Sequence, residues 1–270
     1  MLRRSTAVAA ALVVLLATGC SVVGVLDETS SESSDNSALG DAKLRDRVRA
    51  LVERARSVHV VVDAIGNGEP DTHTDMRLDA RTGDFTARME SGDLVVEVIS
   101  VGSDVYVRAT RLFWADALGY LDPQDDALIN DLYGKYAHLV SDDPLRADVL
   151  TTSKSYDPRG FVGVLAQATR RAGPAPNAHP SIVFEQTGPT GTTHVYIPSK
   201  GRPLPELAIL TGAPTHSRTI AWSDYDAPTR VLPPTPDLIL EMPYGVNRSP
   251  SITAPPPVAH GASPAGDNVR

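Results

Sequence analysis

The spacing of apolar residues changes along the chain at Val58. Residues 41–57 carry apolar side chains at intervals of three and four, and this spacing predicts an amphipathic helix. From Val58 the interval becomes two, and apolar and polar side chains alternate through residues 75–81 and 85–90. Alternation of this kind is typical of strands with one buried face and one solvated face. The pattern therefore predicts one helix followed by strands.

Short turn sequences separate the alternating runs. They contain glycine and fall at residues 66–68, 82–84, 91–93 and 102–104. Loops this short join antiparallel neighbours, because a parallel crossover needs a dozen or more residues. We therefore expect residues 58–108 to form a five-stranded antiparallel meander.

Three Asp-Pro pairs then predict three helix starts. An aspartate can cap a helix, and proline is tolerated in the first helical turn. The helices are expected to begin at Asp122, Asp143 and Asp157, the first running to about Leu139 and the second to Leu150. Acids near these starts are interpreted as caps rather than as catalytic or calcium-binding groups.

Strand patterns resume after the helices, at residues 181–185, 192–198, 204–210 and 218–225. The order of elements predicts an α+β fold with a single large curved antiparallel sheet of about nine strands and helices covering its concave face. The volume between sheet and helices is either a filled core or a ligand cavity.

The N-terminus has the three parts of a bacterial lipoprotein signal. Two arginines precede ten apolar residues at 7–16, and three small residues lead to Cys20, the single cysteine. Ten apolar residues are too few for a membrane-spanning helix. We expect residues 1–19 to be a signal peptide and Cys20 to be lipidated, which would place the protein on the extracytoplasmic face of the cell membrane. The other interpretation is an ordinary signal peptide with an incidental cysteine.

Composition adds boundaries and excludes some partners. Removal of residues 1–19 takes two of the 25 basic residues and none of the 33 acidic ones, so the formal charge becomes 23 minus 33, or −10. A chain this acidic is not expected to bind nucleic acid. Residues 20–40 are rich in Ser, Asp and Glu and predict a flexible tether, and residues 236–270 predict a proline-rich disordered tail. The folded domain is expected over residues 41–235.

Motifs for catalysis and for metal or cofactor binding were not found. The seven histidines are scattered without helical i, i+4 pairs, and no Gly-x-Ser-x-Gly pattern occurs. We therefore expect neither an enzyme nor a bound metal or cofactor.

Short segments resemble a known family of lipoproteins. The helix ending in residues 57–59 and the closing segment Trp222–Pro228, together with the Cys20 signal and the tether, resemble the actinobacterial LppX/LprA/LprF/LprG lipoproteins over residues 1–235. The resemblance implies a half-open β-barrel whose helices cover a hydrophobic cavity for acylated lipids or glycolipids. Residues 236–270 depart from that pattern.

These observations predict a monomeric, membrane-anchored envelope lipoprotein that binds or transfers acylated lipids. The candidates for lining its cavity are Val96, Val98, Phe113, Trp114, Leu132, Phe161 and Leu165. Phe113 and Trp114 are expected at the end of the fifth strand, where they could form the lip of a cavity or a membrane-facing patch. Core packing is the competing interpretation for this pair. The alternative function is a non-enzymatic scaffold with a packed core, in which residues 236–270 dock an envelope protein.

Overall fold

The structure is a computed structural model that describes residues 35–65, 70–118, 123–171, 180–189, 191–212 and 217–242. The predicted lipidation site, Cys20, and the chain after Met242 lie outside these residues. The helices within the described part are η2 (Asn36–Ala38), α1 (Asp41–Arg54), α2 (Arg111–Leu118), α3 (Pro123–Leu132), α4 (Pro144–Tyr156), α5 (Pro158–Gln167) and η3 (Pro236–Leu238).

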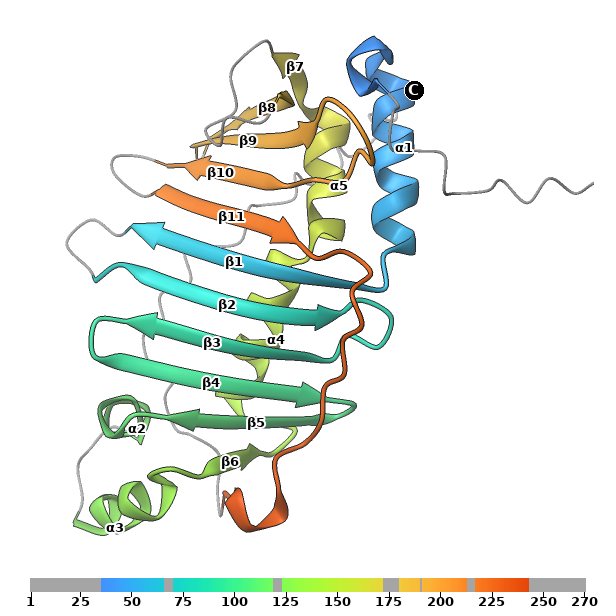
Figure 1. Cartoon of the computed structure of the whole chain (residues 1–270). Helices are drawn as coiled ribbons and strands as arrows, with labels where there is room; N and C mark the ends of the chain where they lie inside the picture. Colours follow the sequence, from blue (N-terminus) through green and yellow to red (C-terminus); the bar gives the residue numbers. More distant parts are fainter. Residues whose placement is uncertain are drawn as a thin grey trace, which may run out of the picture.

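The strands of the described residues form one sheet (Figure 1). They are β1 (Ser57–Ile65), β2 (Thr72–Asp79), β3 (Phe85–Ser91), β4 (Leu94–Val101), β5 (Asp104–Ala109), β6 (Tyr136–Leu139), β7 (Thr169–Arg171), β8 (Ser181–Gly188), β9 (Gly191–Pro198), β10 (Leu207–Thr211), β11 (Ser217–Ser223) and β12 (Ile239–Glu241). Their order is β12-β6-β5-β4-β3-β2-β1-β11-β10-β9-β8-β7, and the two edges do not pair with each other. The described pairs are antiparallel except β12 with β6. The predicted α+β fold with one large, open, mostly antiparallel sheet is confirmed, with twelve strands rather than about nine.

One face of the sheet is buried against the helices. Antiparallel register places Val60, Met76 and Val98 on this inner face, and all three belong to a core cluster that also contains side chains from α1 to α5. Figure 1 shows α4 and α5 behind the strands, with α1 beside α5. The meander and the helix at residue 41 were predicted correctly because their apolar periods are regular.

The region between β5 and α4 differs from the prediction. Phe113 and Trp114 were expected at the end of a strand but lie in α2, whereas Tyr136 and Leu139 were expected in a helix but lie in β6. The helix α3 ends at Leu132, and Gly134 then adopts a φ of +77°, a left-handed conformation that terminates helices. The following residues pair with β5 instead.

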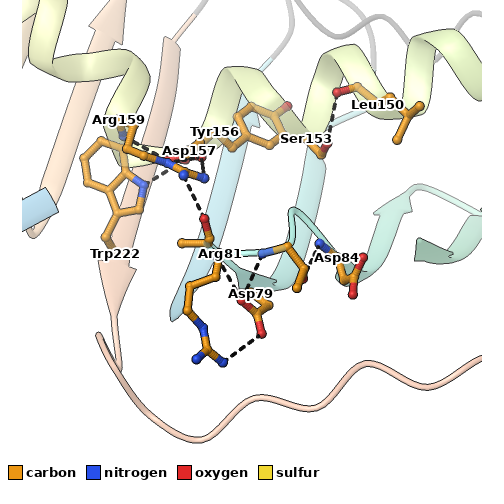
Figure 2. Close-up of polar contacts among 11 residues, drawn as sticks. Asp79, Arg81, Asp84, Leu150, Ser153, Tyr156, Asp157, Arg159 and Trp222 are labelled. Atoms are coloured by element: carbon orange, nitrogen blue, oxygen red, sulfur yellow. Dashed lines mark hydrogen bonds and ion pairs between the residues drawn. The ribbon is translucent and has the colours of Figure 1, made fainter. Parts of the chain in front are cut away.

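Helix α4 is longer than expected and ends at Tyr156 rather than at Leu150. Its last turns are polar, but their hydroxyls donate to carbonyl groups of the same helix. The Thr151 hydroxyl donates to the carbonyl of Ala147 at 2.8 Å, and the Ser153 hydroxyl donates to that of Leu150 at 3.0 Å (Figure 2). Because these hydroxyls are satisfied locally, a polar segment can remain helical beside the core.

The folded part extends beyond the expected boundaries at both ends. Residues 236–241, assigned to the disordered tail, form η3 and β12. At the other end, η2 lies in the predicted tether, and Asn36 is fully buried there. The Asn36 side-chain amide donates to the carbonyls of Pro198 and Gly201 at 3.0 and 3.1 Å. The contacts at both ends are non-local, so neither the polar composition of the tether nor the prolines of the tail gave any indication of them.

Candidate functional site

Helix α4 crosses the inner side of the sheet and is attached near both of its ends. Near its start, the Arg146 guanidinium donates to the carbonyl of Ser103 in the β4–β5 turn at 2.9 Å. At its end, the carbonyl of Tyr156 accepts a hydrogen bond from the Trp222 indole on β11, also at 2.9 Å. The helix therefore bridges the strands that lie between β5 and β11 in the sheet.

The junction of α4 and α5 fixes the second attachment (Figure 2). Asp157 ends α4 and caps α5, where its carboxylate accepts from the backbone N–H of Arg159 at 2.9 Å. The Arg159 guanidinium pairs with that carboxylate and donates to the carbonyl of Ala80 after β2 at 2.7 Å. The hydrogen bond to Asp157 raises the pKa of Arg159. On the inner side, Phe161 meets Trp222 edge to face, with ring centroids 4.8 Å apart.

Apolar side chains are partly exposed in the layer between α4 and the sheet. Ala87 and Met89 point to the inner face of β3, and Val149 and Leu150 belong to the middle of α4. All four pack against the core cluster and remain partly exposed. We call these four residues the inner apolar surface. Met76, which pairs with Ala87 on the adjacent strand, is only 1% exposed.

Polarity changes along the strands of the inner face. One row of paired residues, the apolar row, consists of Met89, Thr74, Val62, Ile220, Ala208, Val195 and Phe184. A second row on the same face, the polar row, consists of Ser91, Thr72, Ala64, Arg218, Leu210, Thr193 and Gln186. The rows are two residues apart on each strand, which is about 7 Å. The inner face is thus amphipathic, with a polar end beside an apolar body.

Arg218 is the charged residue of the polar row. Its side chain points to the helix side of β11, the residue is 7% exposed, and its guanidinium carbon lies 5.6 Å from the centre of the Tyr156 ring. Burial lowers the pKa of Arg218, while Tyr156 acts in the opposite direction. Burial also raises the pKa of Tyr156, which is 6% exposed. A positive charge is therefore placed on an aromatic face inside the protein.

The seven residues predicted to line a cavity all belong to the same core cluster. Their exposed fractions lie between 0 and 4%, and they come from β4, α2, α3 and α5: Val96, Val98, Phe113, Trp114, Leu132, Phe161 and Leu165. Phe113 meets Trp114 edge to face, with ring centroids 5.1 Å apart. The structure brings the seven side chains into one cluster, and their contact with a ligand stays a prediction.

Other residues of the site were not identified from the sequence. These are the inner apolar surface, Tyr156 and Arg218. A usable signal existed for Arg218, because it shares the alternating apolar positions of Ile220 and Trp222 on one strand. An arginine at a position of the buried register indicates a charged group inside the fold. No comparable signal marks Ala87, whose partial exposure depends on how the helices cover the sheet.

The outer face of the sheet carries the four histidines of the described residues. Each lies near a carboxylate: His59 is 3.1 Å from Asp75, His73 is 2.7 Å from Asp63, His138 is 2.8 Å from Glu241, and His194 is 3.2 Å from Glu185. Within the part of the chain that the structure describes, no three His, Cys, Asp or Glu side chains gather in a metal-binding arrangement. The other histidines, at 179, 216 and 260, lie outside the described residues.

Within the described ranges, none of the helices has both the length and the apolar composition required to cross a bilayer. This result applies to the described ranges between residues 35 and 242 and not to the segments between those ranges. The predicted anchor at Cys20 is not part of that range.

Comparison with known proteins finds similar structures. The chain is similar to the lipoprotein LppX from Mycobacterium tuberculosis, with 17% identity over 71% of this chain and 100% of that one, at a TM-score of 0.43. It is also similar to LprF from Mycobacterium bovis, with 15% identity over 72% of this chain and 96% of LprF, at a TM-score of 0.43. A further similar structure is that of the LolA superfamily protein NE2245 from Nitrosomonas europaea. It has 10% identity over 74% of this chain and 96% of NE2245, at a TM-score of 0.26. No family model matches the chain, and no curated protein matches it.

LppX and LprF both belong by name to the group of lipoproteins that the sequence resembles. At identities of 15–17%, the likeness concerns the fold alone. It identifies no ligand and no site residue in this chain.

Proposed function

We propose that this protein is a membrane-anchored envelope lipoprotein that binds acylated lipids or glycolipids between its sheet and helix α4 and transfers them. The observation that supports this most directly is the inner apolar surface. Ala87 and Met89 lie in the middle of the sheet, on the side where neighbouring strands bury their side chains, and yet remain partly exposed. Apolar side chains in such a position can contact acyl chains without first breaking a packed core.

The attachments of α4 suit a carrier. Both ends of the helix are held by hydrogen bonds from Arg146 and Trp222, while Val149 and Leu150 in its middle pack incompletely. Acyl chains that leave a bilayer for the protein exchange one apolar environment for another. The protein therefore needs only to offer the chains about the same free energy of burial as the membrane does. Partly exposed apolar side chains beside a helix that is fixed at both ends would meet this requirement, because their net affinity for acyl chains stays low enough for release.

The anchor on Cys20 is the other part of the proposal. Two or more acyl chains on a cysteine hold a protein stably at a membrane, because each buried CH₂ contributes about 0.8 kcal/mol. Mass spectrometry of the mature N-terminus tests this part. An unmodified thiol at Cys20 would remove the anchor from the proposal and leave the ligand unaffected.

Lipid binding is tested by extracting lipid from the purified full chain. We expect organic extraction to yield lipid in near-stoichiometric amount. Ala87→Trp, which fills the inner apolar surface, should strongly reduce the extracted lipid. Thr86→Trp is the matched control, since it adds the same side chain to the outer face of the same strand.

The result must be independent of misfolding. Cooperative thermal unfolding is therefore required of each variant, and Leu150→Trp provides a second filling variant on the helix side of the site. A wild-type protein without extractable lipid would overturn the proposed function and favour the scaffold. Equal loss of lipid in Ala87→Trp and Thr86→Trp would contradict the location of the site.

A further inference from the structure

The inner face of the sheet combines an apolar row with a polar row, and this order matches the two parts of an amphipathic molecule. The apolar row continues from Met89 to Phe184 across seven strands, with Thr74 as its one polar member. In the polar row, about 7 Å away along the strands, polar residues predominate. A lipid whose chains lie against the inner apolar surface, at the partly exposed Met89 end of the apolar row, could extend its headgroup to the polar row.

The charge of that headgroup follows from Arg218. A guanidinium that is 7% exposed lies in surroundings of lower dielectric than water, where its attraction to an anion is several times stronger than at the surface. Its planar set of N–H donors fits the oxygens of phosphate or carboxylate groups. Tyr156 holds the guanidinium through its ring at the end of α4, next to the attachment of that helix to Trp222.

We propose that Arg218 and the polar row around it form a headgroup site that selects acylated lipids carrying a phosphate or other anionic group. The inference rests on the proposed function, because it assigns the headgroup of the same lipid whose chains meet the inner apolar surface. An arginine guanidinium keeps its proton at neutral pH in proteins, so Arg218 supplies the positive charge that this site requires.

The test compares two lipids that differ in the headgroup alone. Dioleoyl phosphatidylglycerol and dioleoyl glycerol are offered separately, in neutral phosphatidylcholine vesicles, to the full chain stripped of bound lipid. We expect wild-type protein to retain the phosphatidylglycerol in preference to the neutral lipid by about tenfold, the effect of one charge-assisted contact. Arg218→Gln should reduce this ratio to near one while leaving retention of dioleoyl glycerol unchanged.

Two further variants separate the charge at this position from other effects. Arg218→Lys keeps a positive charge and should retain part of the preference. Arg77→Gln removes an arginine from the outer face, where the side chain is 52% exposed, and should leave the ratio at its wild-type value. If Arg218→Gln does not unfold cooperatively, the comparison of Arg218→Lys with Arg77→Gln decides the question. Equal preference in these two variants and in wild type would overturn the assignment.

The source of the anion is tested by competition. An excess of inorganic phosphate should not displace phosphatidylglycerol, because the acyl chains contribute most of the retention. Displacement by phosphate would assign Arg218 to a free anion and overturn the headgroup site. Retention of both lipids in equal amounts by wild type would also overturn it, with the proposed function intact. Retention of neither lipid would instead refute the proposed function itself.

Discussion

The two halves of the sheet are covered differently. In the first half, α1 and α5 cover β1 and β7–β11, and Val60, Phe184 and Val195 on the inner face are fully buried. In the second half, α4 crosses β2–β5, and Ala87 and Met89 on β3 stay partly exposed. We call these the closed half and the open half. The second half also buries Val98 and Val107, so the difference lies at β3, where apolar side chains remain available to the acyl chains of a ligand.

The helices show the same contrast. Leu44, Val48 and Val52 of α1 are spaced four residues apart and are all fully buried. In α4, the apolar residues Val149 and Leu150 are followed by a polar segment, so the helix cannot present a continuous apolar stripe. The regular apolar stripe of α1 lets this helix pack closely in the closed half. The interrupted stripe of α4 leaves part of the open half uncovered.

The largest expected effect is a loss of packing in the closed half. Phe184→Ala removes a fully buried ring that lies 5.2 Å from the guanidinium carbon of Arg45. We expect the free energy of unfolding to fall by about 3–5 kcal/mol, the usual cost of such a cavity. Denaturant-induced unfolding measures it. A cost below about 1 kcal/mol would mean that the closed half can collapse around the cavity, contrary to the comparison.

The end of the chain contributes to the open half through β12. A chain that stops after Thr235 loses the pairing with β6 and the buried side chain of Met242. We expect it to unfold with a free energy about 2–4 kcal/mol lower than a chain that stops after Met242. Thermal unfolding of the two truncated chains provides the measurement. Equal stabilities would support the sequence-based boundary at residue 235 over the structural one.

Within the closed half, the segment after β11 is held by Asp226. Its carboxylate accepts from the backbone N–H of Arg56 at 2.8 Å and pairs with the Arg202 guanidinium at 2.9 Å. Burial acts to raise the pKa of Asp226, but these two contacts outweigh it and lower the pKa. Asp226→Asn should therefore reduce stability at pH 7 by about 1–2 kcal/mol, the value of hydrogen bonds to a charged group.

The effect of Asp226 should depend on pH with a defined sign. The pKa of Asp226 is lower in the folded protein than in the unfolded chain. The stabilisation is therefore fully present above the pKa of the unfolded state, near pH 4, and it disappears as the pH falls through the pKa of the folded state. The difference between wild type and Asp226→Asn should thus be constant from pH 7 to about pH 5 and shrink below pH 4. A difference that persists at pH 2 would assign the effect to packing.

The smallest effect is expected in the open half. Met89→Ala should cost less than about 1 kcal/mol, because the Met89 side chain is partly exposed and its removal creates little new cavity. The same unfolding measurement as for Phe184→Ala allows direct comparison. If the two substitutions cost the same, the halves are packed alike and the inner apolar surface is part of an ordinary core.

Much of the fold could be predicted from local pattern in both halves. The stripe of α1, the alternation in β2 and β3 and the caps of Asp143 and Asp157 are all encoded within short segments. These features depend on period and capping, which act over a few residues.

The errors occur where distant contacts decide the structure. Tyr136–Leu139 has residues compatible with a helix and becomes a strand because β5 is available to pair with it. β12 depends in turn on that strand, in a segment whose prolines indicated disorder. The site was harder still, because the exposure of Met89 depends on the position of α4 rather than on β3 itself. Of the site residues, Arg218 alone was visible in its strand register.

The two ends of the described chain meet the sheet at widely separated places. Asn36 is held at the end of β9, and β12 forms one edge of the sheet, nine strand positions from β9. At about 4.8 Å per strand, this corresponds to a path of roughly 43 Å along the sheet. An attachment preceding Asp35 and a partner bound after Met242 would therefore act at opposite sides of the molecule. The sheet then serves as a spacer that keeps its C-terminal edge remote from whatever surface holds its N-terminal side.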